Sequence, residues 1–325
     1  MKRREFITLL GGAAVALPPT ARAQQPALPV VGFLNGRSAT DTVGLAAAFR
    51  QGLNEVGFVD GRNVAIEYRW ASNQADQLPA LAAELVGRPV AVLAAFGTAS
   101  ALAAKAATTT IPTVFATGDD PIKTGLVSSL SRPDGNITGV TFVAATLGTK
   151  RLQLLRGLAP QAEAIAVLVD PNAPESVNQA ADVEAAARSL GMTITLLQAG
   201  TLGEIEAALA RLSRQRIALI VGGSPALMAG RYHIVALANR YKIPTIGNAR
   251  EYATAGSLIS YGASITEAYR QAALYVGKIL RGDKPSDLPV QQPTRFEMVI
   301  NMKAAKALGI EIPLTLIALA DEVIE

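Results

Sequence analysis

The apolar positions of the chain fall into short runs that alternate with longer stretches rich in alanine and leucine. Short β-branched runs predict buried strands, and the longer stretches have the periodicity of amphipathic helices. Their strict alternation predicts parallel sheets built from right-handed βαβ units. In the first half we expect strands at 30–34, 64–68, 91–96 and 113–116, and helices at 43–56, 77–86 and 99–106. In the second half we expect strands at 165–169, 193–197, 218–221 and 245–247, and helices at 176–190, 202–214 and 231–241.

The second half of the chain repeats the order of the first. Gly57 and Gly191 each follow the first expected helix of their half, and Ile-Pro-Thr at 111–113 recurs at 243–245. These landmarks lie about 130 residues apart, which indicates two lobes of one topology rather than one long sheet. The 325 residues also exceed the roughly 250 that a single core usually serves. The predicted fold class is therefore α/β, with two similar Rossmann-like lobes and parallel sheets.

Three crossings between the lobes are expected, which would make a hinge that closes without shear. We place them near residues 138–142, 258–262 and 289–299. The helix at 265–280 would then return to the first lobe, and the strand at 296–300 to the second. The predicted N-terminal lobe comprises residues 28–141 plus 264–290, and the predicted C-terminal lobe comprises 142–263 plus 291–325.

Residues 1–23 have the pattern of an export signal. Basic Lys2, Arg3 and Arg4 precede an apolar run at 6–17, and Ala-Arg-Ala at 21–23 has the form of a cleavage site. The run is too short for a membrane-spanning helix, which needs about 20 apolar residues. The Arg3-Arg4 pair is compatible with a twin-arginine signal and with a general secretory signal. Both routes lead to the periplasm.

Composition narrows the classes of partner. The chain has no cysteine, which excludes disulfides and lipid attachment at the cleavage site, so we expect a soluble periplasmic protein that is not a lipoprotein. The basic isoelectric point near 9.4 comes largely from residues 1–23, and the remainder is nearly neutral. We therefore expect no nucleic-acid partner. One histidine and scattered acids predict no metal and no cofactor. We also expect a monomer.

Ligands of open parallel sheets bind beyond the carboxyl ends of the strands, where helix N-termini offer free N–H groups. Thr98 has the chemistry of a helix cap, and the amides that follow it can also hold a carboxylate. Asp120, before a proline, either accepts a hydrogen bond from the ligand or starts a turn. The candidate residues of the first lobe are Asn35, Ser38, Thr98, Ala99 and Asp120.

The second lobe offers a matching set of polar loops. Ser224 followed by Pro225 is typical of a helix start. Arg250 either binds a carboxylate or forms a surface ion pair, and the two tyrosines either stack on a ring or pack in the core. The candidate residues are Asn172, Ser176, Ser224, Arg250, Tyr252 and Tyr261. Three phenylalanines are expected in the core rather than in the pocket, namely Phe33, Phe115 and Phe142.

Taken together, these segments resemble the family of ABC-transporter solute-binding proteins that includes TrpX-like members, which bind tryptophan or tyrosine. The resemblance runs from about residue 29 to the end. The stretches that carry it are Val-Gly-Phe-Leu at 31–34, Gly-Thr-Ala-Ser-Ala at 97–101, Asp-Pro at 120–121, Arg-Pro-Asp-Gly-Asn-Ile-Thr-Gly at 132–139, Arg-Glu-Tyr at 250–252, Ser-Tyr-Gly at 260–262 and Val-Ile-Asn-Met-Lys at 299–303.

The resemblance implies a type I periplasmic-binding fold, with a small carboxylated solute bound in the interlobe cleft. It also implies that the protein delivers this solute to an ABC importer, whose permease in the inner membrane would be the partner. Some family members bind aromatic amino acids. Carrying this over makes the candidate contacts the loops at Asn35, Thr98, Asp120, Asn172, Ser224 and Arg250. Gly-Ser-Leu-Ile at 256–259 replaces the Gly-Gly-Leu-Met of many relatives, so the identity of the ligand does not carry over directly.

Other functional classes fit the sequence less well. Gly-Gly-Ser-Pro-Ala at 222–226 approximates a serine-hydrolase nucleophile elbow at Ser224. The only histidine, His233, is too close in sequence to act as the base, and Pro225 lacks an N–H that an oxyanion hole needs. We therefore expect no enzyme. A transcription regulator of this fold would carry a helix-turn-helix in place of the export signal. A periplasmic sensor that docks on a receptor remains an alternative to transport.

Overall fold

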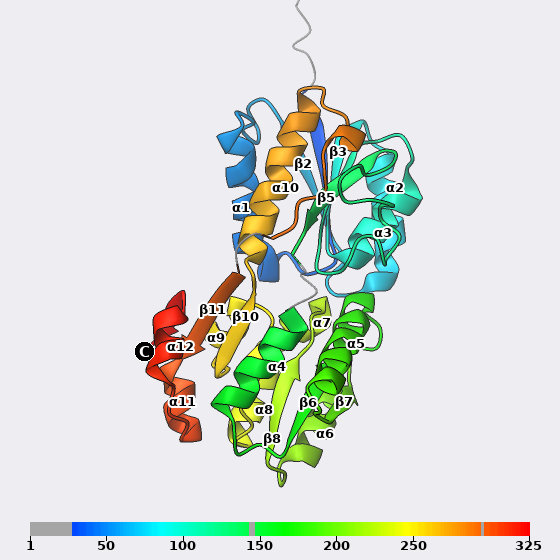
Figure 1. The fold of residues 1–325 in the computed structure, drawn as a ribbon. Helices are drawn as coiled ribbons and strands as arrows, with labels where there is room; N and C mark the ends of the chain where they lie inside the picture. Colours follow the sequence, from blue (N-terminus) through cyan, green and yellow to red (C-terminus); the bar gives the residue numbers. More distant parts are fainter. Residues whose placement is uncertain (1–27, 143–146, 294–295) are drawn as a thin grey trace, which may run out of the picture.

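The computed structural model describes residues 28–142, 147–293 and 296–325. The predicted signal at 1–23 lies outside the described residues. The described chain forms two α/β lobes, one above the other, each with a central sheet between two layers of helices (Figure 1). None of the described helices is long and apolar enough to cross a membrane.

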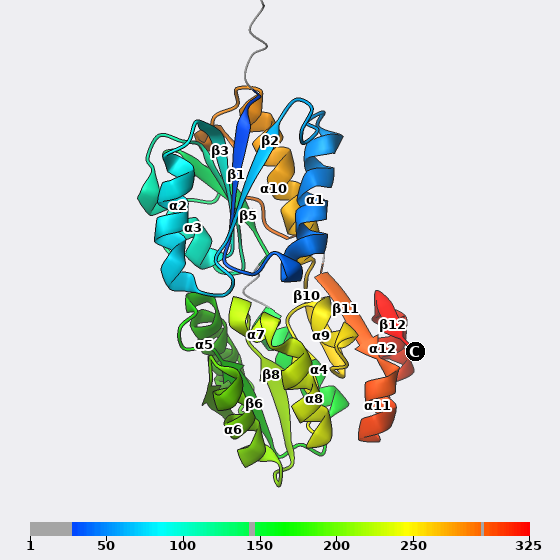
Figure 2. The ribbon, with the colours of Figure 1, turned by 180° about the vertical axis from the view of Figure 1, so that it is seen from behind.

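The first lobe contains a five-stranded parallel sheet in the order β2-β1-β3-β4-β5. Its strands are β1 (Val30–Asn35), β2 (Ala65–Trp70), β3 (Val90–Phe96), β4 (Thr113–Thr117) and β5 (Ile137–Thr141). One face packs against α1 (Val43–Glu55) and α10 (Ile265–Leu280), and the other against α2 (Leu78–Val86) and α3 (Thr98–Ala107) (Figure 2). Short 3-10 turns lie at η1 (Thr40–Thr42), η2 (Ala75–Gln77) and η3 (Pro285–Asp287).

The second lobe contains a seven-stranded sheet in the order β12-β11-β10-β9-β8-β6-β7. Its strands are β6 (Ala164–Val169), β7 (Ile194–Gln198), β8 (Ile217–Val221), β9 (Thr245–Gly247), β10 (Ile259–Ala263), β11 (Phe296–Asn301) and β12 (Glu322–Ile324). All pairs are parallel except β10 with β11, which is antiparallel. The expectation of purely parallel sheets therefore fails at one pair. There the chain enters β11 on its way back from the first lobe.

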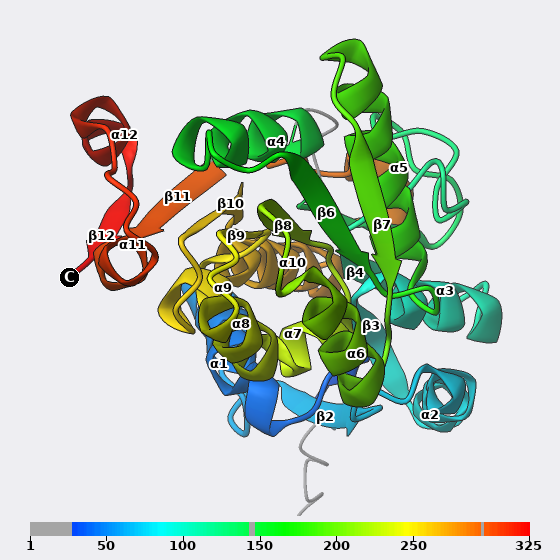
Figure 3. The same cartoon turned by 90° about the horizontal axis from the view of Figure 1, so that it is seen from below.

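Helices cover both faces of this second sheet as well (Figure 3). On one face lie α4 (Leu147–Leu158) and α5 (Pro174–Ser189), and on the other lie α6 (Leu202–Leu212) and α8 (Arg231–Arg240). Shorter helices complete the lobe, namely α7 (Pro225–Ala229), α9 (Arg250–Thr254), α11 (Met302–Leu308) and α12 (Leu314–Leu319). The strands and helices predicted for the two halves are all present, with ends within about two residues. The start of α7 was expected at Pro225, whereas α4, α9, α11 and α12 were not predicted.

The chain passes between the lobes after β5, after β10 and before β11. Two of the predicted crossings, 138–142 and 258–262, instead fall largely on the strands β5 and β10, and the chain crosses just beyond them. Residues 143–146 and 294–295 of the first and third crossings lie outside the described part. Helix α10 packs along α1, as the expected return to the first lobe requires. The exact lobe boundaries remain a prediction.

Candidate ligand-binding site

A cavity of about 430 Å³ lies between the lobes, beyond the carboxyl ends of both sheets. The first lobe contributes polar and aromatic side chains, including Asn35, Arg37, Asn73, Asp76, Phe96, Thr98, Ala99, Ser100, Phe142 and Tyr269. The second lobe contributes a more acidic and amide-rich wall, including Asp170, Asn172, Glu175, Gln179, Ser224, Met228 and Asn248. Because the walls belong to different lobes, a solute that fills the cavity contacts both.

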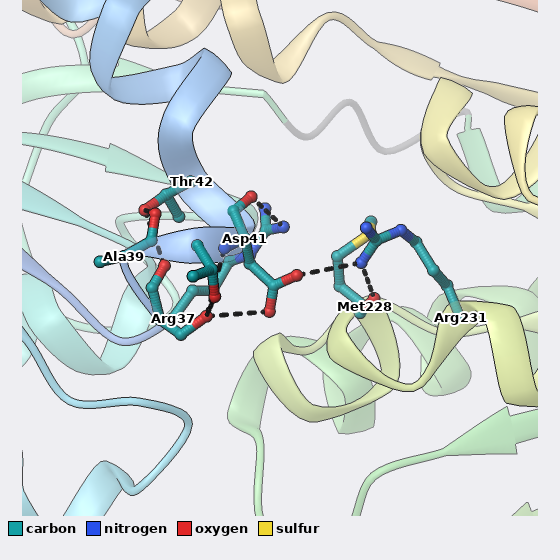
Figure 4. A network of polar contacts seen from close by, with 8 residues as sticks. Arg37, Ala39, Asp41, Thr42, Met228 and Arg231 are labelled. Atoms are coloured by element: carbon teal, nitrogen blue, oxygen red, sulfur yellow. Dashed lines mark hydrogen bonds and ion pairs between the residues drawn. The ribbon is translucent and has the colours of Figure 1, made fainter.

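The lobes touch directly beside this cavity, so the structure is a closed form. Arg231 at the start of α8 points its guanidinium at Asp41 of the first lobe, with Nη1 3.3 Å from Oδ1 (Figure 4). The same Nη1 donates to the carbonyl oxygen of Met228 at 2.7 Å. Arg37 holds the backbone of Asp41 in place, because its Nη2 donates to the carbonyl oxygen of Asp41 at 3.1 Å. Opening the cleft must break the Arg231–Asp41 contact.

A second set of interlobe contacts joins α5 to the loop after β4. Asn178 donates through Nδ2 to Oδ2 of Asp119 at 2.8 Å, and Gln179 donates through Nε2 to the carbonyl oxygen of Gly118 at 3.2 Å. Gln179 also accepts from the N–H of Gly223 at 3.1 Å, which holds the side chain against its own lobe. Helix α5 therefore carries both an interlobe contact and part of the cavity wall.

The N-terminus of α3 forms one end of the cavity. Gly97, with φ of +93°, turns the chain from β3 into the helix, and a side chain would be strained in that conformation. The first intrahelical bond is donated by Ala101 to the carbonyl oxygen of Gly97, so the amides of residues 98–100 precede it. No side chain caps this terminus. The expectation that Thr98 caps the helix is wrong, because its Oγ1 instead lies 2.7 Å from Oγ1 of Thr117.

Two buried polar atoms of the first lobe add to this end of the cavity. The Nε atom of Arg37 and the Oγ atom of Ser100 have no hydrogen-bond partner within the described chain, although both residues are buried and line the cavity. Buried polar groups are nearly always paired, so unpaired atoms that face a cavity mark places where a ligand completes the bonding. A positive guanidinium beside free helix amides favours an anionic group.

The second lobe supplies negative charge. Glu175, at the N-terminus of α5, is 7% exposed, and its Oε2 has no partner among the described residues. Burial, followed by the negative charges of Asp119 and Asp170, raises the pKa of Glu175 to about 7. Asp170 is also buried, and its Oδ1 accepts from the N–H of Asn172 at 3.0 Å. The walls that the two lobes contribute to the cavity therefore differ in charge preference.

Aromatic rings form a further part of the cavity wall. Phe96 of β3 and Tyr269 of α10 stack with ring centroids 4.0 Å apart and an interplanar angle of 17°. Asn35 fixes the tyrosine by donating through Nδ2 to its hydroxyl at 2.8 Å. Phe142 lines the cavity as well as packing against the core of the first lobe, whereas Phe33 and Phe115 are fully buried as expected. Such a wall suits a flat apolar group.

Five of the candidate residues line the cavity together, namely Asn35, Thr98, Ala99, Asn172 and Ser224. Ser224 caps α7 by accepting from the N–H of Leu227 at 3.0 Å, as its pairing with Pro225 indicated. The other six do not line the cavity, namely Ser38, Asp120, Ser176, Arg250, Tyr252 and Tyr261. Each of these six is engaged elsewhere in the fold.

The three smaller residues form hydrogen bonds within their own loops or with a neighbouring one. Ser38 bonds within its own turn, donating to Oδ2 of Asp41 at 3.2 Å. Asp120 starts a turn, with Oδ1 accepting from the N–H of Ile122 at 2.9 Å, which is the second of the two possibilities considered for it. Ser176 is fully buried, and its Oγ accepts from the N–H of Asp170 at 2.9 Å. Their oxygens hold loops in place rather than facing the cavity.

The three larger residues pack or pair inside the second lobe. Arg250 forms ion pairs with Glu297 and Glu322 on the neighbouring strands. Tyr252 is fully buried in the core between the sheet, α6 and α8, and burial raises its pKa. Tyr261 lies on β10 with its ring 6.2 Å from that of Phe296. Their expected contact with a ligand is therefore not supported by where they lie.

Several residues of the cavity were not among the candidates. Arg37 stands two residues after Asn35 in the same loop, and Glu175 directly follows the proline that begins α5. Both residues lie just beyond the carboxyl ends of strands, where ligands of parallel sheets bind, so the sequence could have indicated them. Tyr269 lies four residues after Ile265 on one face of α10, a helix that was expected only to return the chain. No sequence signal marked the loop at Asn73.

This architecture, two α/β lobes closed over a polar and aromatic cavity, defines a two-lobed periplasmic-binding fold. The chain belongs to the family described as ABC transporter substrate binding protein, whose model matches residues 29–324. Its members bind solutes and are not enzymes, so the hydrolase alternative at Ser224 is set aside. The resemblance seen in the sequence is thereby confirmed.

Individual relatives support the same assignment. The chain is 27% identical over 263 residues to a tyrosine-binding protein of Clostridioides difficile, covering 81% of this chain and 76% of that protein. A conserved domain protein of Vibrio cholerae has a TM-score of 0.84 at 26% identity, over 91% of this chain and 99% of that one. A protein of Streptococcus pneumoniae in complex with L-Trp shares the fold, with a TM-score of 0.85 at 24% identity, over 91% and 100% of the two chains.

A ligand-free, open structure gives a lower TM-score. This substrate-binding protein with adhesive properties, from Clostridium difficile, has a TM-score of 0.67 at 25% identity, over 88% of this chain and 96% of that one. A two-lobed protein superposes less well on an open relative when its own lobes are closed. The lower score therefore agrees with the direct contacts between the lobes in the present structure.

Proposed function

We propose that the protein is the periplasmic component of an ABC importer and binds an aromatic amino acid in the interlobe cavity. The observation that carries the proposal is that the cavity is lined by anion-binding donors of the first lobe, by aromatic rings and by carboxylates of the second lobe. An amino acid with a flat side chain presents a carboxylate, a ring and an ammonium group, which match these three parts.

The carboxylate is assigned to the first lobe. The amides that open α3 and the guanidinium of Arg37 are donors in the first-lobe wall of the cavity. The side chain of the solute then lies against Phe96, Phe142 and Tyr269. The volume of about 430 Å³ falls within the usual range for small-molecule sites. The tyrosine-binding protein of Clostridioides difficile and the L-Trp complex of the same fold both support an aromatic amino acid as the ligand.

Closure links binding to transport. The open form binds the solute on one lobe, and closure brings the second lobe onto it, because the Arg231–Asp41 pair and the Asn178–Asp119 bond form only across the closed cleft. The closed form then docks on a permease in the inner membrane. Residues 1–23 would direct export to the periplasm, where a monomer suffices for this cycle. Use as a periplasmic sensor would require the same cavity but a receptor in place of the permease.

The proposal is tested by the thermal stability of the purified protein against aromatic and aliphatic amino acids, sugars and nucleosides. A ligand at about 100 times its dissociation constant stabilises the folded state by roughly 2.7 kcal/mol, enough to raise the unfolding midpoint by several degrees. We expect L-tyrosine or L-tryptophan to produce this shift.

Two variants locate the response. Ala99→Trp fills the cavity from α3 and should abolish the shift, whereas Arg250→Ala, outside the cavity, should retain it. A shift with sugars or nucleosides but not with amino acids would overturn the proposed ligand class. A shift that survives Ala99→Trp would overturn the proposed site.

A further inference from the structure

Glu175 is a buried carboxyl group with one unpaired oxygen, and it lines the cavity. It is 7% exposed, it lines the cavity, and its Oε2 accepts no hydrogen bond within the described chain. No lysine or arginine of the described chain pairs with it. Burying a carboxylate unpaired is costly, so a fold that keeps one at a binding site points to a partner that arrives with the ligand.

The surroundings of Glu175 make this need stronger. The charged groups that act on it are Asp119 and Asp170, and both are acidic. Asp119 is already occupied by Asn178, and Asp170 by the N–H of Asn172. Among these three residues, only Glu175 has a carboxylate oxygen that is both fully buried and without a hydrogen bond in the described chain. Arg37, the cation of the cavity wall, belongs to the other lobe.

We propose that Glu175 is the specificity-determining residue for a cationic nitrogen in the ligand, which it binds through its free Oε2 when the cleft closes. This inference rests on the proposed function, because it assigns the ammonium of an amino acid to the second lobe. A charge-assisted hydrogen bond of this kind is stronger than a neutral one. It also places the carboxylate and the ammonium of one solute on different lobes.

The same contact makes closure depend on occupancy. When the cleft closes empty, Glu175 is buried beside Asp119 and Asp170, where its ionised form is disfavoured. An ammonium group removes that penalty, whereas a deaminated acid of the same shape does not. The protein should therefore close preferentially around ligands that carry the positive charge, which keeps the empty form from resembling the loaded one.

The test compares three compounds by calorimetric titration: L-tyrosine, its deaminated analogue 3-(4-hydroxyphenyl)propionate and its decarboxylated analogue tyramine. In the wild-type protein L-tyrosine should bind at least about a hundredfold more tightly than the deaminated acid, because that acid leaves Glu175 unpaired. In Glu175→Gln the ratio should fall below about tenfold. Glu184→Gln removes a charge from the same helix away from the cavity and should keep the wild-type ratio.

The outcomes separate this inference from the proposed function. If wild-type protein binds the deaminated acid as tightly as L-tyrosine, the role of Glu175 is overturned, and the carboxylate site stands. This comparison needs no variant, so it holds even if Glu175→Gln fails to fold. If a folded Glu175→Gln protein keeps the wild-type ratio of affinities for L-tyrosine and the deaminated acid, the role of Glu175 is likewise overturned. If tyramine binds and neither acid does, Glu175 is supported and the carboxylate assignment fails. If none of the three binds, both proposals fail for this class of solute.

Discussion

Breaking the ion pair between Asp41 and Arg231 should weaken ligand binding without weakening either lobe. The pair joins different lobes at 3.3 Å, and its side chains are 22% and 14% exposed. Opening the cleft separates the two residues, so the energy of the pair contributes to closure and hence to the measured affinity. Partly exposed pairs of this kind contribute about 0.5 to 1 kcal/mol. The expected loss is therefore about two- to fivefold in the dissociation constant.

A double-mutant cycle isolates this contribution. Asp41→Asn and Arg231→Gln should each weaken the binding of L-tyrosine, and the double variant should be hardly weaker than either single variant. The coupling should shrink in 1 M salt, because exposed charges are screened. Glu84→Gln breaks the Arg69–Glu84 pair within the first lobe and serves as the control, with unchanged affinity. Strictly additive single effects, or a coupling that persists in salt, would refute the reasoning.

Three further changes have defined expected effects. Tyr252→Phe removes a buried hydroxyl without a partner, so chemical denaturation should show equal or about 1 kcal/mol greater stability, and ligand affinity should not change. Thr201→Ala removes the capping box of α6 and should lower stability by about 1 kcal/mol in the same assay. The pKa of Glu175 is higher in the folded protein than in the unfolded chain, so its stabilising contribution is present near pH 4 and is lost as the pH rises through about 7. Urea titrations should therefore favour Glu175→Gln over wild type more at pH 8 than at pH 5.

The fold could be predicted from the sequence because strand and helix patterns alternate strictly along both halves. The helix Ile265–Leu280 has the apolar period of an amphipathic helix, and the apolar run Val90–Phe96 has the length of a buried strand. The elements that were not predicted are short or lie near the crossings. The helix Leu147–Leu158 follows the first crossing, in a stretch for which we expected no helix or strand.

The site could be predicted only to the level of loops. The rule that ligands bind at the carboxyl ends of strands correctly selected the loops of Asn35 and Thr98, but it does not say which side chain in a loop faces inward. After β9, Tyr252 of α9 is buried in the core beneath the sheet. Gly247 leaves the space for it, since an added Cβ there would lie 2.3 Å from that of Tyr252. Arg250 is drawn outward by Glu297, a residue 47 positions away. Such long-range packing and pairing are not visible in local patterns.

The most direct test of the account is a crystal structure of the protein grown with L-tyrosine. We predict one molecule between the lobes, with its carboxylate at the N-terminus of α3, its ring beside Phe96 and Tyr269, and its ammonium at Glu175. Solute density on an outer surface with an empty cavity would contradict the central claim. A molecule bound in the cavity with its carboxylate at Glu175 would contradict the assigned orientation of the site.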